Sequence, residues 1–143
     1  MRLPNGSRII GLPGMEATIR GYSAVSLMII DEAARVRDPV YKALRPMLAV
    51  GGGDLWLLST PFGKRGFFYE NWASGSDDWV RVAAPATECA RISKEFLEEE
   101  KRQMGEAWFR QEYLCEFVED GGYMFERDLV MGALDDDGEP LRF

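Results

Sequence analysis

Two acidic residues, Asp31 and Glu32, come directly after the apolar run Leu27–Ile30. Carboxylate oxygens are good ligands for Mg²⁺. In phosphoryl-transfer enzymes one carboxylate holds the metal, while a neighbouring residue can orient the attacking water. These residue types therefore suit nucleotide hydrolysis, with Asp31 near the metal and Glu32 near the water. The competing interpretation is structural, because an acidic pair can simply cap the positive amino-terminal end of the next helix.

A pair of hydroxyl residues, Ser59 and Thr60, ends a second apolar run, Leu55–Leu58. Small hydroxyl groups in such a place could hydrogen-bond a γ-phosphate or the attacking water, and could thereby respond to whether the phosphate is present. Taken alone, the tripeptide Ser59–Pro61 is more typical of a turn that ends a strand. The functional interpretation is favoured only when the two apolar runs are considered together.

Those two runs predict two parallel strands. A fully apolar run such as Leu27–Ile30, within a strand over Ala24–Ile30, is typical of a strand buried on both faces. Between the runs, Val40–Leu48 has apolar residues at helical spacing, and Pro46 predicts a kink or an early stop. A strand, a helix and a second strand form a βαβ unit. In open α/β sheets ligands bind at the carboxyl ends of the strands, where both polar pairs would lie.

Other segments are expected to complete the fold. Ser7–Pro13 and Trp79–Pro85 predict two further strands, and Phe67–Trp72 predicts an aromatic-rich helix. A long helix is expected over Lys94–Phe117, with Ser93 at its amino-terminal end and an interruption near Gly105.

The last residues have an irregular composition. Residues 121–143 begin with a glycine pair and predict an irregular tail. Consecutive aspartates at Asp135–Asp137 could be taken for metal ligands, but on a glycine-containing tail they are more typical of solvated residues.

Length and composition limit the function classes. The chain has 143 residues, of which 46% are hydrophobic and 29% charged, as expected for one globular domain. The net charge of −7 argues against strong nucleic-acid binding by this segment alone. There is no histidine, so acid–base chemistry would rest on Asp, Glu, Lys or water.

Cysteine usage and hydropathy exclude further classes. Two cysteines, Cys89 and Cys115, provide neither a metal-ligand cluster nor a disulfide framework, and they indicate reduced thiols in a cytosol-like compartment. No apolar run approaches the ~20 residues that span a bilayer, and the start lacks the apolar core of a secretory signal. We therefore expect no membrane association.

The motifs together resemble those of the large terminase subunits of tailed bacteriophages. The order and spacing match over residues 5–120, and the combination is far more specific than any single motif. The matching segments are Asn5–Pro13, Thr18–Ser23, Leu27–Ala34, Leu58–Gly63 and Trp108–Phe117.

The resemblance implies an α/β fold: a partial P-loop NTPase-type (ASCE) parallel sheet flanked by helices, followed by a long helix and an irregular tail. Residues 1–120 would form the carboxyl-terminal part of a terminase-like ATPase domain, and residues 121–143 a linker toward a nuclease domain. Asp31 would be the Walker B aspartate associated with Mg²⁺, and Glu32 the catalytic glutamate for ATP hydrolysis. Ser59 and Thr60 would form the motif that couples hydrolysis to movement.

Arg20 is a further candidate catalytic residue. An arginine on a glycine-flanked loop is usually a solvated surface residue, but ring ATPases use a cation that reaches into a neighbour's nucleotide site. The resemblance places Arg20 where the family can present such an arginine.

The resemblance also implies partners and a location. The function would be DNA packaging, in which a motor couples ATP hydrolysis to translocation of double-stranded viral DNA into the procapsid. The partners would be that DNA, the portal protein, the small terminase subunit and other copies of the chain in a ring. The location would be the host cytoplasm and, transiently, the procapsid portal.

One departure from the family pattern affects activity. The phosphate-cradling motif Gly-x-x-x-x-Gly-Lys-[Ser/Thr] does not occur in the sequence. We therefore expect an internal piece of a terminase that does not turn over ATP in isolation. The alternatives are a fragment of a helicase-type ATPase, against which Ala34 counts, and a non-catalytic interaction remnant of such a domain.

Overall fold

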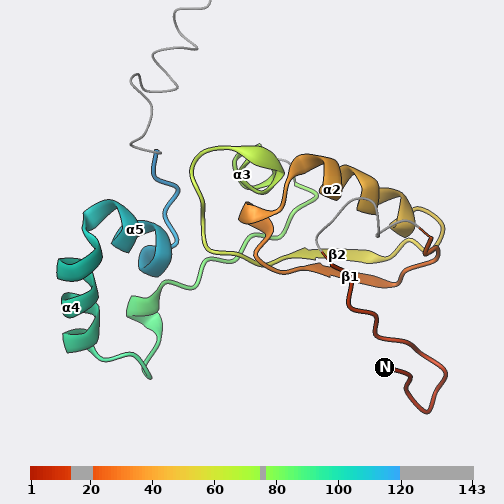
Figure 1. The fold of residues 1–143 in the computed structure, drawn as a ribbon, viewed down its shortest axis with the longest axis horizontal. Coiled ribbons are helices and arrows are strands. Elements are labelled where there is room, and N and C mark those ends of the chain that lie inside the picture. The colour runs from red at the N-terminus through yellow and green to blue at the C-terminus, as the bar shows by residue number, and fades with distance from the viewer. Residues whose placement is uncertain (14–20, 75–76, 120–143) are drawn as a thin grey trace, which may run out of the picture.

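The computed structural model describes residues 1–13, 21–74 and 77–119. Its regular elements are short, and together they form a sheet–helix part followed by a pair of helices (Figure 1). In chain order they are β1 (Leu27–Ile30), the 3₁₀ turn η1 (Ala33–Arg35), α2 (Asp38–Leu44), η2 (Arg45–Leu48), β2 (Asp54–Leu57), α3 (Gly66–Ala73), η3 (Ala86–Glu88), α4 (Lys94–Met104) and α5 (Glu106–Leu114).

The two strands pair in parallel, as the βαβ pattern predicts. The register runs from Leu27 opposite Asp54 to Ile30 opposite Leu57, so both strands end at the same level. Helices α2 and α3 lie on one side of the strands (Figure 1). The core forms between them, and the predicted α/β arrangement is confirmed. Its buried side chains are Met28, Ile30, Ala33, Val40, Leu44, Met47, Leu48 and Phe67.

The opposite face of the sheet is open, which contradicts the prediction of a strand buried on both faces. Burial along β1 alternates, with Met28 and Ile30 inside and Leu27 and Ile29 outside. Ile29 is 53% exposed, and its paired residue Trp56 is 54% exposed. A continuous apolar run shows that both faces of a strand are apolar, but it does not show that both are covered.

Two predicted strands are wrong. Ser7–Pro13 forms no strand, and only an isolated antiparallel bridge links Arg8 to Arg2. Trp79–Pro85 is also not a strand, and its side chains Val80 and Val82 are exposed. Instead, the Arg81 guanidinium donates hydrogen bonds to the carbonyl oxygens of Asn71, Trp72 and Trp79.

The predicted helix after β2 is confirmed as α3. An acidic side chain of α2 supports its first turn, because Asp38 Oδ1 accepts a hydrogen bond from the Phe67 amide at 3.0 Å. The rings of Phe67 and Tyr41 stack with their centroids 4.0 Å apart. Helices α2 and α3 therefore pack as one layer.

The predicted long helix is two helices separated at Gly105. The Ser93 hydroxyl caps α4, accepting a hydrogen bond from the Phe96 amide at 3.2 Å. Gly105 has φ 82°, which favours glycine and ends α4. The second helix ends at Leu114 rather than at Phe117, because Cys115 takes a left-handed conformation.

Part of the predicted organisation falls beyond these elements. The proposed boundary at residue 120 and the tail, including Asp135–Asp137, lie outside the described residues. Within residues 1–13, 21–74 and 77–119, no helix is long and apolar enough to cross a membrane.

Candidate nucleotide site at the carboxyl ends of the strands

The acidic pair and the hydroxyl pair lie side by side, because their strands are adjacent and in register. The Leu58 amide donates to the Ile30 carbonyl at 3.0 Å, and the Ala33 amide donates back to the Leu58 carbonyl at 3.0 Å. These two bonds continue the hydrogen-bond pattern of the paired strands into the loops that follow β1 and β2. Asp31 and Glu32 therefore share one edge of the sheet with Ser59 and Thr60.

Glu32 has an unusual backbone conformation. Its φ of 51° and ψ of 39° are left-handed, which costs a residue with a Cβ atom about 1–3 kcal/mol. Its amide donates to Asp31 Oδ1 at 3.0 Å. Both residues are exposed, so their carboxylates face solvent rather than the core. A strained, exposed carboxylate beside a second one is an arrangement that a ligand could use.

The hydroxyl pair has two different environments. Ser59 Oγ accepts a hydrogen bond from the Ala34 amide at 3.2 Å, which ties the loop after β2 to the loop after β1. Its hydroxyl hydrogen can still donate to a ligand. Thr60 follows, half-buried, in the same loop. Ser59 thus helps to shape the site as well as being a candidate to contact its ligand.

An arginine that the sequence analysis did not select lies beside Glu32. Arg35 Nε is 3.7 Å from Glu32 Oε2, and an Arg35 terminal nitrogen donates to Glu112 Oε1 at 3.0 Å. Its guanidinium also lies 4.5 Å from the centroid of the Phe62 ring. The spacing of Glu32 and Arg35 could have indicated the first contact. Nothing in the sequence pattern indicated the contact with α5.

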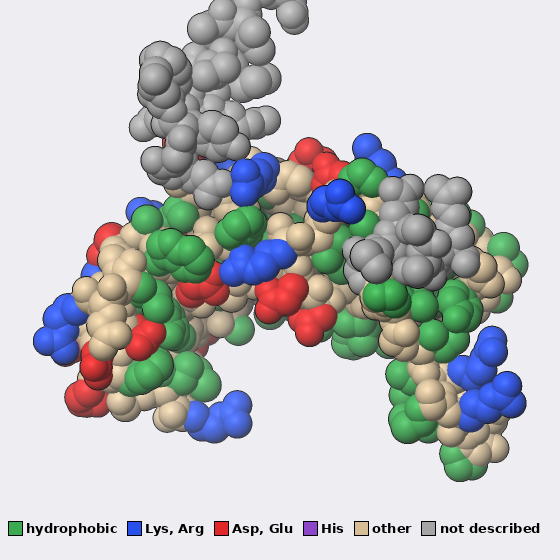
Figure 2. Space-filling view, viewed as in Figure 1, with side chains coloured by type: hydrophobic (Ala, Val, Ile, Leu, Met, Phe, Trp, Pro, Cys, Tyr) green, Lys and Arg blue, Asp and Glu red, His purple; other side chains and the backbone are tan. Residues whose placement is uncertain are grey.

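Helix α5 contacts the site loops through a second polar residue. Gln111 is buried, and its Oε1 accepts a hydrogen bond from the Gly63 amide at 3.3 Å. Lys64 forms an ion pair with Glu119 at 3.1 Å. Figure 2 shows acidic and basic side chains next to one another in the middle of the face that it presents. Helix α5 is therefore attached to the site loops by polar contacts of Gln111 and Glu112.

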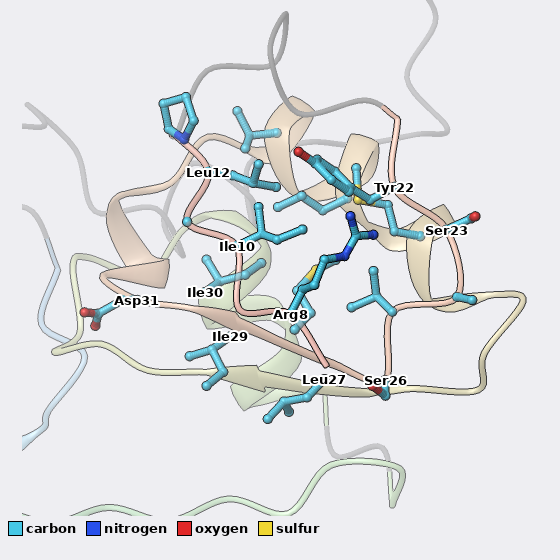
Figure 3. A pocket seen from close by; sticks show the side chains of 18 of the residues that line it. Arg8, Ile10, Leu12, Tyr22, Ser23, Ser26, Leu27, Ile29, Ile30 and Asp31 are labelled. Carbon is cyan, nitrogen blue, oxygen red and sulfur yellow. The ribbon is translucent and has the colours of Figure 1, made fainter. Parts of the chain in front are cut away.

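A hollow of about 630 Å³ lies along β1. Its lining includes Arg8, Ile10 and Leu12 of the amino-terminal segment, Tyr22, and residues of β1 and α2. Asp31 stands at one end of the hollow, at the carboxyl end of the strand (Figure 3). Ile10 and Leu12 give the hollow apolar walls, and its charged lining residues are Asp31 and Arg8.

Asp31 is a candidate ligand for magnesium. No cluster of three or more His, Cys, Asp or Glu occurs among the described residues. Magnesium usually keeps several waters and takes one or two carboxylates together with substrate phosphates. The exposed carboxylate of Asp31 fits that requirement.

The predicted catalytic residue Arg20 lies outside the described residues. The structure therefore shows neither its position nor its contacts, and its role stays a prediction.

Comparison with known proteins places the chain in a family. Residues 1–130 match the family described as terminase large subunit, T4likevirus-type, N-terminal. The chain is also 29% identical over 133 residues to the terminase large subunit of Escherichia phage T5. That match covers 88% of the chain but 30% of the T5 protein.

Two solved structures of the large terminase ATPase domain of Thermus phage P74-26 are similar as well. An arginine-to-alanine mutant is 26% identical with a TM-score of 0.58, covering 68% of this chain and 46% of that one. The other is 27% identical with a TM-score of 0.52, covering 70% and 46%. The order of elements, the paired polar loops and these matches agree: the chain belongs to the family of phage terminase large subunits.

Proposed function

We propose that the loops after β1 and β2 form the metal-binding and water-activating part of the ATP site of a large terminase. The observation that carries this proposal is the hydrogen bonding of the two loops at one sheet edge, through Ala33, Leu58, Ala34 and Ser59. The similarity to solved terminase ATPase domains supports it. The chain spans 30% of the T5 relative, so the reaction is assigned to the assembled protein.

The proposed reaction is hydrolysis of the β–γ phosphate bond of ATP by in-line attack of water. Asp31 would hold Mg²⁺, which when bound neutralises charge on the phosphate oxygens. Glu32 would hydrogen-bond the attacking water, align it with the γ-phosphorus and take up its proton. The hydroxyls of Ser59 and Thr60 would contact the γ-phosphate or the water, and so distinguish ATP from ADP.

The remaining parts of the ATP site must come from other segments. The sequence has no Gly-x-x-x-x-Gly-Lys-[Ser/Thr] motif, so another segment of the assembled motor would cradle the phosphates. Arg20 would be presented to a neighbouring copy. The work performed would be translocation of double-stranded viral DNA into a procapsid. That work would involve the portal protein, the small terminase subunit and further copies in a ring.

The test is an ATPase assay on the chain co-expressed with the products of the adjoining genes. Replacing Glu32 with Gln keeps the shape of the side chain but removes the proton acceptor. We expect turnover to fall by about 10²–10⁴-fold, the usual contribution of general acid–base catalysis. Glu70→Gln, at an exposed position on α3, is the matched control and should leave turnover unchanged. Full turnover by the Glu32→Gln protein would refute the assignment.

A second experiment tests whether Asp31 binds the metal. Asp31→Asn removes the negative charge that attracts Mg²⁺, so half-maximal turnover should require a higher Mg²⁺ concentration. The 143-residue chain alone should show no turnover. Turnover by the isolated chain that Glu32→Gln abolishes would contradict this last expectation.

A further inference from the structure

The Arg35 side chain joins the candidate catalytic loop to a helix that is distant in the sequence. One guanidinium contacts Glu32 in the loop after β1, Glu112 on α5 and the ring of Phe62 in the loop after β2. Glu112 lies 77 residues further along the chain. The loops after β1 and β2 and helix α5 therefore meet at a single cation.

The two carboxylates are held unequally. Glu112 accepts a hydrogen bond from Arg35 at 3.0 Å, and its side chain is 23% exposed. Glu32 approaches only to 3.7 Å, and its side chain is 65% exposed. An exposed ion pair without a hydrogen bond is weak, whereas a shielded and hydrogen-bonded pair is stronger. Arg35 is thus held firmly by α5 and Phe62, whereas it holds Glu32 by a weaker contact that a competing ligand can replace.

The anchor on α5 is itself well supported. Glu112 Oε1 also accepts from Gln111 Nε2 at 3.4 Å, and Gln111 Oε1 accepts from the Gly63 amide. Consecutive side chains of α5 therefore hold both site loops, one through Arg35 and one through Gly63. A movement of α5 would be transmitted to Arg35 and from there to Glu32.

We propose that Arg35 is a positioning residue that holds the Glu32 carboxylate away from the attacking water when no nucleotide is bound, and that couples this position to α5. The proposal rests on the proposed function, which makes Glu32 the water-orienting residue. When Glu32 turns toward a bound nucleotide, the full charge of Arg35 is left to Glu112, which strengthens the attachment of α5. The α4–α5 pair would therefore be held more firmly in the nucleotide-bound state.

Hydrogen–deuterium exchange on the 143-residue chain tests the coupling without any nucleotide. The loop amides of residues 33–36 report on the Glu32 loop, because those of Ala33, Ala34, Arg35 and Val36 are hydrogen-bonded. The amides of residues 106–114 report on α5. Arg35→Gln should speed exchange in both segments by roughly two- to fivefold, the range for loss of such an ion pair. Exchange in β1 and β2 should stay unchanged, which shows that the variant is folded.

A double-mutant cycle separates coupling from simple docking of the helix. Glu112→Gln should speed exchange not only in α5 but also in the loop of residues 33–36. This effect on the loop should vanish in an Arg35→Gln background, because the connection has already been removed. Arg37→Gln and Glu116→Gln are the matched controls, and both should leave the loop unchanged.

Two results would overturn the proposal. One is a loop that exchanges at the same rate in the wild-type, Arg35→Gln and Glu112→Gln chains. The other is additive effects of the two substitutions, since independent contributions mean that Arg35 transmits nothing. The exchange test does not depend on ATP, so it can succeed or fail independently of the ATPase assay. If the exchange rates change as expected but the assembled protein shows no turnover, the proposed reaction is refuted and the coupling through Arg35 is not.

Discussion

Ser59 shows how a single side chain can serve the fold and the site together. Its oxygen accepts a hydrogen bond from the Ala34 amide, which links the loops after the two strands and fixes the position of the hydroxyl oxygen in the candidate site. Because that amide would lose its partner, Ser59→Ala should lower the free energy of unfolding by about 0.5–1.5 kcal/mol.

Urea unfolding of the chain measures this change. Thr87→Ala, at an exposed position in η3, is the control and should unfold at the wild-type denaturant concentration. Identical midpoints for the Ser59→Ala and wild-type chains would show that the bond contributes nothing to stability.

The sequence alone identified Asp31, Glu32, Ser59 and Thr60 as neighbours because one rule was enough. Parallel strands end at a common edge, so the residues that follow them meet. Arg35 could not be identified in the same way. Its partner Glu112 belongs to α5, and no local pattern specifies where a helix so distant in the chain will dock. Contacts set by one repeating geometry are predictable, whereas contacts set by tertiary packing are not.

At the scale of elements, the turn before β2 depends on glycine at one position. A Cβ atom built on Gly53 would lie 2.0 Å from the Val25 carbonyl oxygen and 2.9 Å from backbone atoms of Ser26. An alanine there must push β1 and β2 apart where they begin to pair. We expect Gly53→Ala to destabilise the chain by about 2–4 kcal/mol.

Thermal or urea unfolding checks this expectation against Gly11→Ala. A Cβ atom on Gly11 meets nothing within 4 Å. A Gly53→Ala chain as stable as the Gly11→Ala chain would mean that the close approach can relax without loss.

The contact between α4 and α5 predicts a dependence on alkaline pH. Burial, and the hydrogen bond that Tyr113 Oη donates to Glu100 Oε2 at 2.9 Å, raise the pKa of Tyr113 above its ordinary value of 10.0. The negative charges of Glu100 and Glu112 act in the same direction. The folded chain therefore favours the neutral phenol, and the resulting stability is present below pH 10.0 and lost as the pH rises through the folded-state pKa.

Titration of tyrosinate absorbance and unfolding at several alkaline pH values measure this effect. Glu100→Gln should lower the pKa of Tyr113, since it removes the nearest negative charge. Tyr113→Phe should abolish this component of the pH dependence. If the Phe variant loses stability over the same pH range as the wild type, then another group is responsible.

The elements also show where sequence patterns mislead. Capping by Ser93 and the break at Gly105 are local properties, and both were predicted correctly. Trp79–Pro85 has a strand-like composition, but Val80 and Val82 are exposed and the backbone follows the contacts of Arg81. A strand forms only where a partner strand accepts its hydrogen bonds, and composition does not supply one.

At the scale of the whole molecule, the open face of the sheet should affect behaviour in solution. Leu27 and Ile29 of β1, Trp56 of β2 and Leu58 directly after β2 are exposed. Contiguous apolar surface on a sheet favours association with a second copy. We expect the isolated chain to self-associate as its concentration rises, and Ile29→Thr with Trp56→Thr to reduce that association.

Sedimentation velocity over a range of concentrations measures this behaviour. Val50→Thr changes an exposed apolar residue in the turn before β2 and is the control. A wild-type chain that sediments as a monomer at every concentration would contradict the expectation.

The attachment of α5 has a mechanical consequence. The helical pair is held to the strand loops through Gln111 and Glu112 of α5, and α4 lies farther from the strands than α5 does (Figure 1). Helix α4 has 11 residues, which at about 1.5 Å per residue makes an arm of roughly 16 Å. Tilting such an arm by about 10° moves its far tip by roughly 3 Å. A small rotation at the contacts of Gln111 and Glu112 would then become a displacement of several ångströms at the far end of the helical pair.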